Sequence, residues 1–93
     1  MKKFVVERNF PGAANLTANE LQEMSRMSCE AIVALNQPYY WLCSFVTEDK
    51  IYCIHAAENE DLIREHARLG NMPVNMIAEV KTIIDPSNSS PIK

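Results

Sequence analysis

The fold follows from residues 40–56, YWLCSFVTEDKIYCIHA. The two halves of this stretch, 40–46 and 51–56, are dense in the aromatic and β-branched residues that favour strands. The polar residues 47–50 between them predict the turn of a β-hairpin. The segments on either side of the hairpin then decide what packs against it.

Before the hairpin, the sequence predicts a strand and then a helix. Residues 4–8 are strand formers, and the turn-prone residues 9–12 end the strand. Thr17 and Glu20 have the spacing of a capping box, in which each side chain bonds to the backbone N–H of the other residue. Apolar residues recur at helical spacing after this box, and Pro38 predicts that the helix ends near Asn36.

After the hairpin, the sequence predicts a second helix and a fourth strand. Acidic residues favour the N-terminal end of a helix over 58–69, and Gly70 suits its exit. Residues 77–84 predict the last strand, which ends at Asp85-Pro86. This order of elements is that of the ferredoxin-like fold, an α+β sandwich (βαββαβ) in which two helices cover one face of a four-stranded antiparallel sheet. Right-handed crossovers place the first and third strands in the middle of the sheet.

The composition is that of one globular domain. Of the 93 residues, 47% are hydrophobic, and we place the domain at residues 1–86 and a flexible polar tail at 87–93. A net charge of -3 with scattered basic residues disfavours binding to nucleic acid. The chain has no apolar run that could span a membrane, no apolar signal region, and three cysteines, an odd number for a secreted domain. These features predict a cytoplasmic protein.

Strand alternation divides the predicted sheet into two faces, given a two-residue turn at 48–49. One face collects the side chains that we expect under the helices, which are Phe4, Val6, Trp41, Cys43, Phe45, Tyr52, Ile54, Val80 and Ile84. The other face mixes apolar and polar side chains, which are Val5, Glu7, Leu42, Ser44, Val46, Ile51, Cys53, His55, Ile77, Glu79 and Lys81. Such a surface is poorly suited to water, so we expect a second copy to pack across it as a homodimer with a polar cleft between the sheets.

Fragments spread along the whole chain together resemble one protein family. They are Phe4-x-x-Glu7-Arg8, Trp41-x-x-Ser44-Phe45-Val46, Asp49-Lys50, Cys53, Ile63-Arg64-Glu65-His66-Ala67, Pro73-Val74 and Asp85-Pro86. The family is bacterial, consists of small proteins mostly of unknown function, and includes a nickel-binding, nickel-responsive streptomycete protein. The resemblance implies a ferredoxin-like homodimer that binds nickel or another divalent metal, and it implies no particular set of ligands in this chain.

Cys53, His55 and Glu7 are the candidate metal ligands. Cys53 and His55 are two residues apart on one strand, and thiolate and imidazole are ligands that nickel and zinc prefer. Glu7 adds a carboxylate on the same predicted face. Each residue also has a structural interpretation: Cys53 as a small buried hydrophobe, His55 as a hydrogen-bonded interface residue, and Glu7 as half of an ion pair.

Five further polar side chains are candidates for contacts to a small organic ligand. These are Ser44, Tyr52, His66, Glu79 and Lys81. His66 lies on the second predicted helix and could instead have a structural role, packing against the turn at Gly70.

Three functions are compatible with these residues. The first is a homodimeric binding or sensing protein, not an enzyme, that holds a divalent metal, nickel by resemblance. The second is a cofactor-independent enzyme that acts on a small organic molecule in the cleft, with Glu7 or His55 as general base and Tyr52 or Lys81 orienting the substrate. The third is a ligand-free module whose sheet serves only for dimerisation.

Overall fold

A computed structural model of the chain describes residues 1–89, and its elements follow the predicted order. The strands are β1 (Lys2–Asn9), β2 (Tyr39–Val46), β3 (Lys50–Ala57) and β4 (Met76–Glu79). The helices are α1 (Ala18–Leu35) and α2 (Glu60–Leu69), with short 3-10 helices η1 (Ala13–Asn15) and η2 (Pro86–Ser89). Helix η2 falls partly within the segment predicted as a flexible tail, and residues 90–93 of that segment lie outside the described residues.

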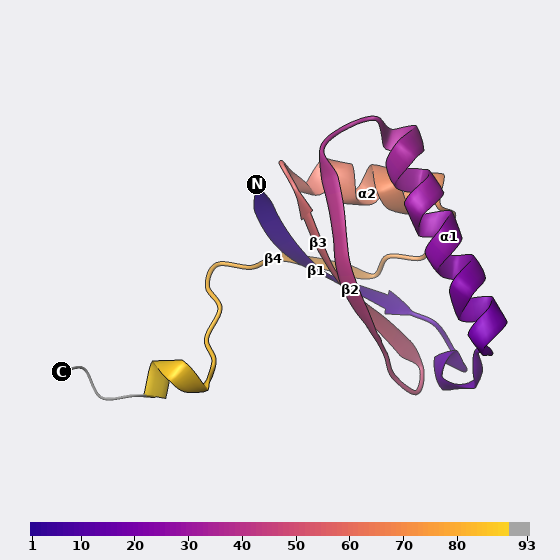
Figure 1. The fold of residues 1–93 in the computed structure, drawn as a ribbon, viewed down its shortest axis with the longest axis horizontal. Helices are drawn as coiled ribbons and strands as arrows, with labels where there is room; N and C mark the ends of the chain where they lie inside the picture. The colour runs from indigo at the N-terminus through magenta and orange to yellow at the C-terminus, as the bar shows by residue number, and fades with distance from the viewer. Residues whose placement is uncertain (90–93) are drawn as a thin grey trace.

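The four strands form one antiparallel sheet in the order β2-β3-β1-β4. Strands β1 and β3 therefore lie in the middle, as the right-handed crossovers predict. Figure 1 shows both helices on the same side of this sheet. The ferredoxin-like α+β fold is confirmed, and within residues 1–89 no helix covers the opposite face of the sheet.

The capping box fixes the start of α1 as predicted. The Thr17 hydroxyl accepts a hydrogen bond from the Glu20 backbone N–H at 3.1 Å, and the Thr17 N–H donates to Glu20 Oε1 at 2.9 Å. At the other end, Asn36 adopts the left-handed conformation with φ 52° and stops the helix. No helix within residues 1–89 is long and apolar enough to cross a membrane.

Strand β3 determines which side chains face the helices. Its residues alternate between half-buried and buried, and the buried row is Ile51, Cys53, His55 and Ala57. The neighbouring strand β1 adds Phe4, Val6 and Arg8 to the same face, because these residues pair with His55, Cys53 and Ile51. The core therefore lies on the side of β3 that we expected to be open.

The prediction of the faces was half right. Phe45 does pair with Tyr52, and Cys43 with Ile54, so these four residues share a face as predicted. That face is the one without helices, because Phe4 and Val6 lie on the opposite side. The physical reason is that alternation sorts side chains into two rows but does not determine which row the helices cover.

A β-bulge in β2 changes the direction of one more side chain. Trp41 pairs with His55, whereas Cys43 pairs with Ile54, so Leu42 is an extra residue in this strand. The bulge turns Trp41 to the helix side, where it is half-buried. Trp41 therefore lies under the helices as predicted, but its partners there differ from the predicted ones.

The last strand is shorter than predicted. β4 ends at Glu79, and the Val80 N–H still donates to the Lys3 carbonyl at 2.8 Å. After this bond the chain turns away from β1, and residues 81–89 leave the body as an arm (Figure 1). Ile84, expected in the core, is 78% exposed on this arm.

Replacing Thr17 tests the contribution of the capping box. We expect Thr17→Ala to lower the free energy of unfolding by about 1 kcal/mol, because the first turn of α1 loses a hydrogen-bond acceptor. Urea denaturation followed by circular dichroism measures this change. Thr82→Ala, an exposed residue of the arm, is the control and should stay within about 0.5 kcal/mol of wild type. Equal losses in the two variants would contradict the role of the box.

Candidate ligand-binding cavity

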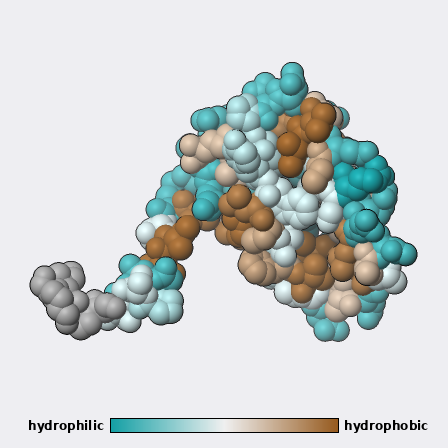
Figure 2. Space-filling model, viewed as in Figure 1, coloured by the Kyte–Doolittle hydropathy of each residue, from teal (hydrophilic) through white to brown (hydrophobic). Residues whose placement is uncertain are grey.

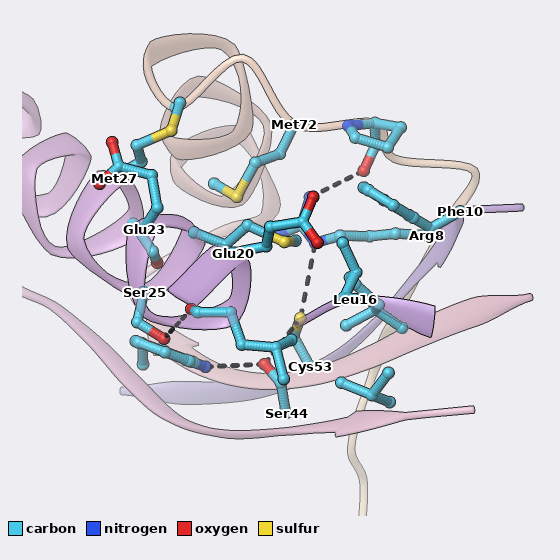
Figure 3. Close-up of a pocket in the computed structure, with 18 of the residues that line it drawn as sticks. Arg8, Phe10, Leu16, Glu20, Glu23, Ser25, Met27, Ser44, Cys53 and Met72 are labelled. Carbon is cyan, nitrogen blue, oxygen red and sulfur yellow. Dashed lines mark hydrogen bonds between the residues drawn. The ribbon is translucent and has the colours of Figure 1, made fainter. Parts of the chain in front are cut away.

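A cavity of about 620 Å³ lies between α1 and the sheet. The N-terminal half of α1, the hairpin β2–β3 and the segment after α2 enclose it. Its wall is mostly apolar and includes Phe10, Leu16, Met24, Trp41, Ile51 and Met72. Figure 3 shows Met72 on one side of this space, with Ser44 and Cys53 from the sheet on the other. The volume is typical of a site for a small molecule.

Arg8 is the buried cation of the cavity wall. The residue is only 3% exposed. Its Nε donates to Cys53 Sγ at 3.5 Å, and its Nη1 donates to the Pro73 carbonyl at 2.8 Å (Figure 3). No ion pair within residues 1–89 includes Arg8. A guanidinium that is always charged is therefore held inside the protein by a carbonyl and a sulfur, without a carboxylate.

A short hydrogen-bond chain crosses from β2 to β3 along the same wall. The Trp41 indole N–H donates to Ser44 Oγ at 2.9 Å, and the Ser44 hydroxyl donates to Cys53 Sγ at 3.0 Å. Together with Arg8, this chain directs two donors at the Cys53 sulfur. These contacts hold the polar side chains of the wall in fixed positions.

Two histidines and a tyrosine pack together beside the cavity. The Tyr39 hydroxyl lies 2.6 Å from His55 Nδ1, and its ring stacks on His66 with centroids 4.6 Å apart. His66 Nε2 lies 3.1 Å from the Ser28 carbonyl, so this nitrogen carries the ring proton and donates it. His55 Nε2 and His66 Nδ1 are buried and have no hydrogen-bond partner in the described part of the chain.

Burial keeps this cluster neutral. Burial lowers the pKa of His55 to about 3, and the nearby His66 and Arg8 act in the same direction. Burial also lowers the pKa of His66, although the hydrogen bond to Ser28 opposes it. For Tyr39, burial raises the pKa. Near neutral pH the three rings therefore carry no charge.

The three candidate metal ligands do not converge as predicted. Cys53 and His55 share the helix-covered face, but Glu7 lies on the opposite face, beside Tyr52. Glu7 follows Val6 in the strand, so alternation turns it away from the core. Its carboxylate lies 3.4 Å from Lys50 Nζ and accepts a hydrogen bond from the Asn75 amide. Within residues 1–89 no group of three His, Cys, Asp or Glu side chains could hold a metal ion. A metal role for these residues stays a prediction.

The five candidates for a small organic ligand are also dispersed. Ser44 lines the cavity, and His66 lies behind it against Tyr39. Tyr52 is on the helix-free face. Glu79 and Lys81 lie at the far edge of the sheet, where their side chains form an ion pair at 3.1 Å. Only Ser44 among the five contributes to the cavity surface.

Sequence reasoning missed Arg8. We assigned it no role of its own from the sequence, because arginine is rarely buried without an acid. Its spacing did contain a signal: Arg8 continues the alternate row Phe4, Val6, Arg8 that points to the core. Burying a cation in a row of apolar residues costs free energy of folding, so such a position suggests a functional role.

The fold and cavity together define a ferredoxin-like α+β protein with a cavity between α1 and the sheet. The model of the SCO4226-like family, described as nickel responsive protein SCO4226-like, matches residues 4–80, so the chain belongs to this family. The crystal structure of SCO4226 from Streptomyces coelicolor A3(2) is similar, with a TM-score of 0.74 and 13% sequence identity over 88% of this chain and 99% of that chain. No curated protein matches the sequence. The resemblance to the nickel-responsive family is confirmed.

The buried histidines predict that stability falls as the pH is lowered. Unfolding restores a pKa of about 6.5 to each imidazole, so the unfolded chain binds more protons below that pH. The stability they contribute is complete above pH about 6.5 and is lost as the pH falls towards the folded-state pKa of about 3 for His55. We expect a slope of up to about 1.4 kcal/mol per pH unit for each histidine.

Urea denaturation at pH 7.5, 6.5 and 5.5 measures this slope. Carboxyl groups with a lowered pKa, such as Glu20 and Asp85, affect stability below this range. The chain has 2 histidines, so His55→Gln should retain only the part of the slope due to His66. A flat profile in the wild-type protein would contradict the buried neutral cluster.

Proposed function

We propose that this protein is a homodimeric binding protein that holds a small ligand in the cavity between α1 and the sheet. The observation that carries this proposal is the cavity of about 620 Å³, which joins an apolar wall to a few buried polar groups in fixed positions. Apolar surface supplies affinity in such a site, and the polar groups supply orientation.

The chemistry of the cavity favours binding over catalysis. The enzyme hypothesis used Glu7 or His55 as general base. Glu7 lies on the opposite face of the sheet, and a pKa of about 3 makes His55 a weak base near neutral pH. The His55 Nδ1 nitrogen is also engaged by the Tyr39 hydroxyl at 2.6 Å.

The helix-free face of the sheet supports a dimer. It presents large apolar side chains to solvent, including Tyr40 and Phe45, each 59% exposed, and the adjacent Leu42 at 51%. Half-buried Tyr52 and Ile54 lie between them on β3. A group of exposed apolar side chains of this kind marks an interaction surface. A second copy related by a two-fold axis would cover it with an identical patch.

The C-terminal arm also favours a second copy as the occupant. Residues 81–89 leave their own domain, and Ile83 and Ile84 are 65% and 78% exposed. Figure 2 shows hydrophobic residues along this arm. Residues 81–85 of the arm, before helix η2, reach roughly 17 Å when extended, enough to contact a neighbouring sheet. In a dimer, the apolar arm of each protomer can therefore cover the helix-free face of the other protomer.

Phe45→Asp tests the dimer. Light scattering coupled to size-exclusion chromatography should give twice the 10.6 kDa mass of the chain for the wild-type protein. We expect the variant to dissociate with a dissociation constant raised at least about 100-fold, because each interface would bury an unpaired carboxylate. Val33→Asp, at a 78% exposed position on α1, is the matched control and should leave the dimer intact. A wild-type monomer would contradict the proposal.

Family membership favours a divalent metal, nickel, as a second candidate ligand. The donors of one protomer do not fit a closed site, since no suitable group of three lies within residues 1–89. Glu7 and the exposed Cys43 both lie on the helix-free face, where a second copy would bring the same donors again. Thiolate and carboxylate are competent ligands for such a metal. We therefore assign the nickel donors to two protomers.

Nickel uptake by tag-free protein tests this assignment. After equilibrium dialysis against nickel, elemental analysis should find the metal in the wild-type dimer and in Val33→Asp. The monomeric Phe45→Asp variant should take up none, and Cys43→Ala should take up less than wild type. If the monomer binds nickel and His55→Ala abolishes that binding, the shared site is wrong and the metal belongs to the helix-covered face.

A further inference from the structure

We propose that the cavity binds a small apolar monocarboxylate whose carboxylate lies against the guanidinium of Arg8. This inference rests on the proposed ligand-binding function and specifies the chemical class of the ligand. The apolar wall receives the body of the molecule, and the buried cation receives its head.

The first support is the unbalanced charge of Arg8. A buried ion is costly unless an opposite charge compensates it. Arg8 is 3% exposed, and within residues 1–89 its Nε and Nη1 donate hydrogen bonds only to the Cys53 sulfur and the Pro73 carbonyl. Its Nη2 group has no hydrogen bond to the described part of the chain. A carboxylate at this nitrogen would supply both the missing charge and the missing acceptor.

The second support is the position of the nearest acids. Glu20 and Glu23 line the cavity, but neither forms an ion pair with Arg8. The Glu20 carboxylate accepts from the Thr17 N–H, and that of Glu23 pairs with Arg26. Both residues are exposed at the rim, so their charges are screened by solvent. Arg8 therefore attracts an anionic group to the inner end of the cavity, whereas Glu20 and Glu23 repel one at the entrance. This arrangement favours a ligand whose single anionic group lies at its inner end.

The third support is the neutrality of the rest of the wall. Near neutral pH, His55 carries no charge and does not compete with Arg8 for the anion. Leu16, Met24 and Met72 surround the space with flexible apolar side chains. Methionine adapts to ligands of different shape, so the wall selects for apolar character more than for one outline. The chain's 1 tryptophan, Trp41, lies in this wall and gives a direct optical signal.

A matched pair of probes tests the inference. We use 4-phenylbutanoate and its neutral isostere 4-phenylbutanamide, and we follow each titration of the wild-type protein by calorimetry and by Trp41 fluorescence. The carboxylate should bind at least about tenfold more tightly than the amide, as expected for a charge-assisted hydrogen bond. Equal affinities would overturn the inference and leave the binding function intact. Binding of neither probe would overturn both.

Two variants test whether Arg8 causes the preference for the carboxylate over the amide. Arg8→Met should bring the two affinities to within about twofold of each other, mainly by weakening the carboxylate. Arg68→Met removes an exposed arginine on α2 and is the control that should keep the wild-type ratio. A full preference for the carboxylate in folded Arg8→Met would overturn the assignment to Arg8. The wild-type ratio remains a test even if this variant does not fold.

Ser25→Phe tests whether the probes bind in the cavity or elsewhere on the surface. Ser25 lines the cavity from α1, and a phenyl ring there would fill part of the space without touching the helix-free face. The variant should weaken both probes by a similar factor. Unchanged affinity for both probes would place them outside the cavity and contradict the inference.

Discussion

Short and polar side chains on the central strand leave space beneath the helices. Cys53, His55 and Ala57 follow Ile51 in the inner row of β3, whereas Tyr52 and Ile54 face outward. A sheet with its larger side chains under the helices would fill that layer and leave a polar outer face. Here the arrangement is reversed, and both main features of the molecule follow: a cavity on the covered side and an apolar surface on the open side.

Local signals in the sequence were sufficient for the elements and their order. The capping box at Thr17, the turn at 48–49 and the strand formers on both sides act over a few residues, and each element forms where they predict it. The faces depend on contacts between distant strands. Alternation sorted Phe45 with Tyr52 correctly, but it could not show whether that pair lies under the helices or away from them. The bulge at Leu42 has no local signature, since neither glycine nor proline marks it.

The candidate site could be predicted only in part, because local signals place residues within one strand but not between strands. Cys53 and His55 were placed together, and they are together, because two residues on one strand keep their relation whichever face they occupy. Glu7 was placed with them only through the register between strands, and that step failed. Arg8 was overlooked because its charge suggested a surface position, although its register with Val6 gave the opposite indication. The outer strand also ended early, because pairing with β1 stops after the bond between Val80 and Lys3, and the apolar residues 83–84 carry no signal of where that pairing ends.

The bulge in β2 has a consequence for how many copies of the chain can join. β2 is an edge strand, and an uninterrupted edge offers unpaired N–H and C=O groups on which strands of other molecules can polymerise. The extra residue at Leu42 breaks the regular spacing of those groups halfway along the edge. Extension of the sheet along β2 from one molecule to the next is thereby discouraged, which leaves the helix-free face as the surface through which the proposed dimer would form.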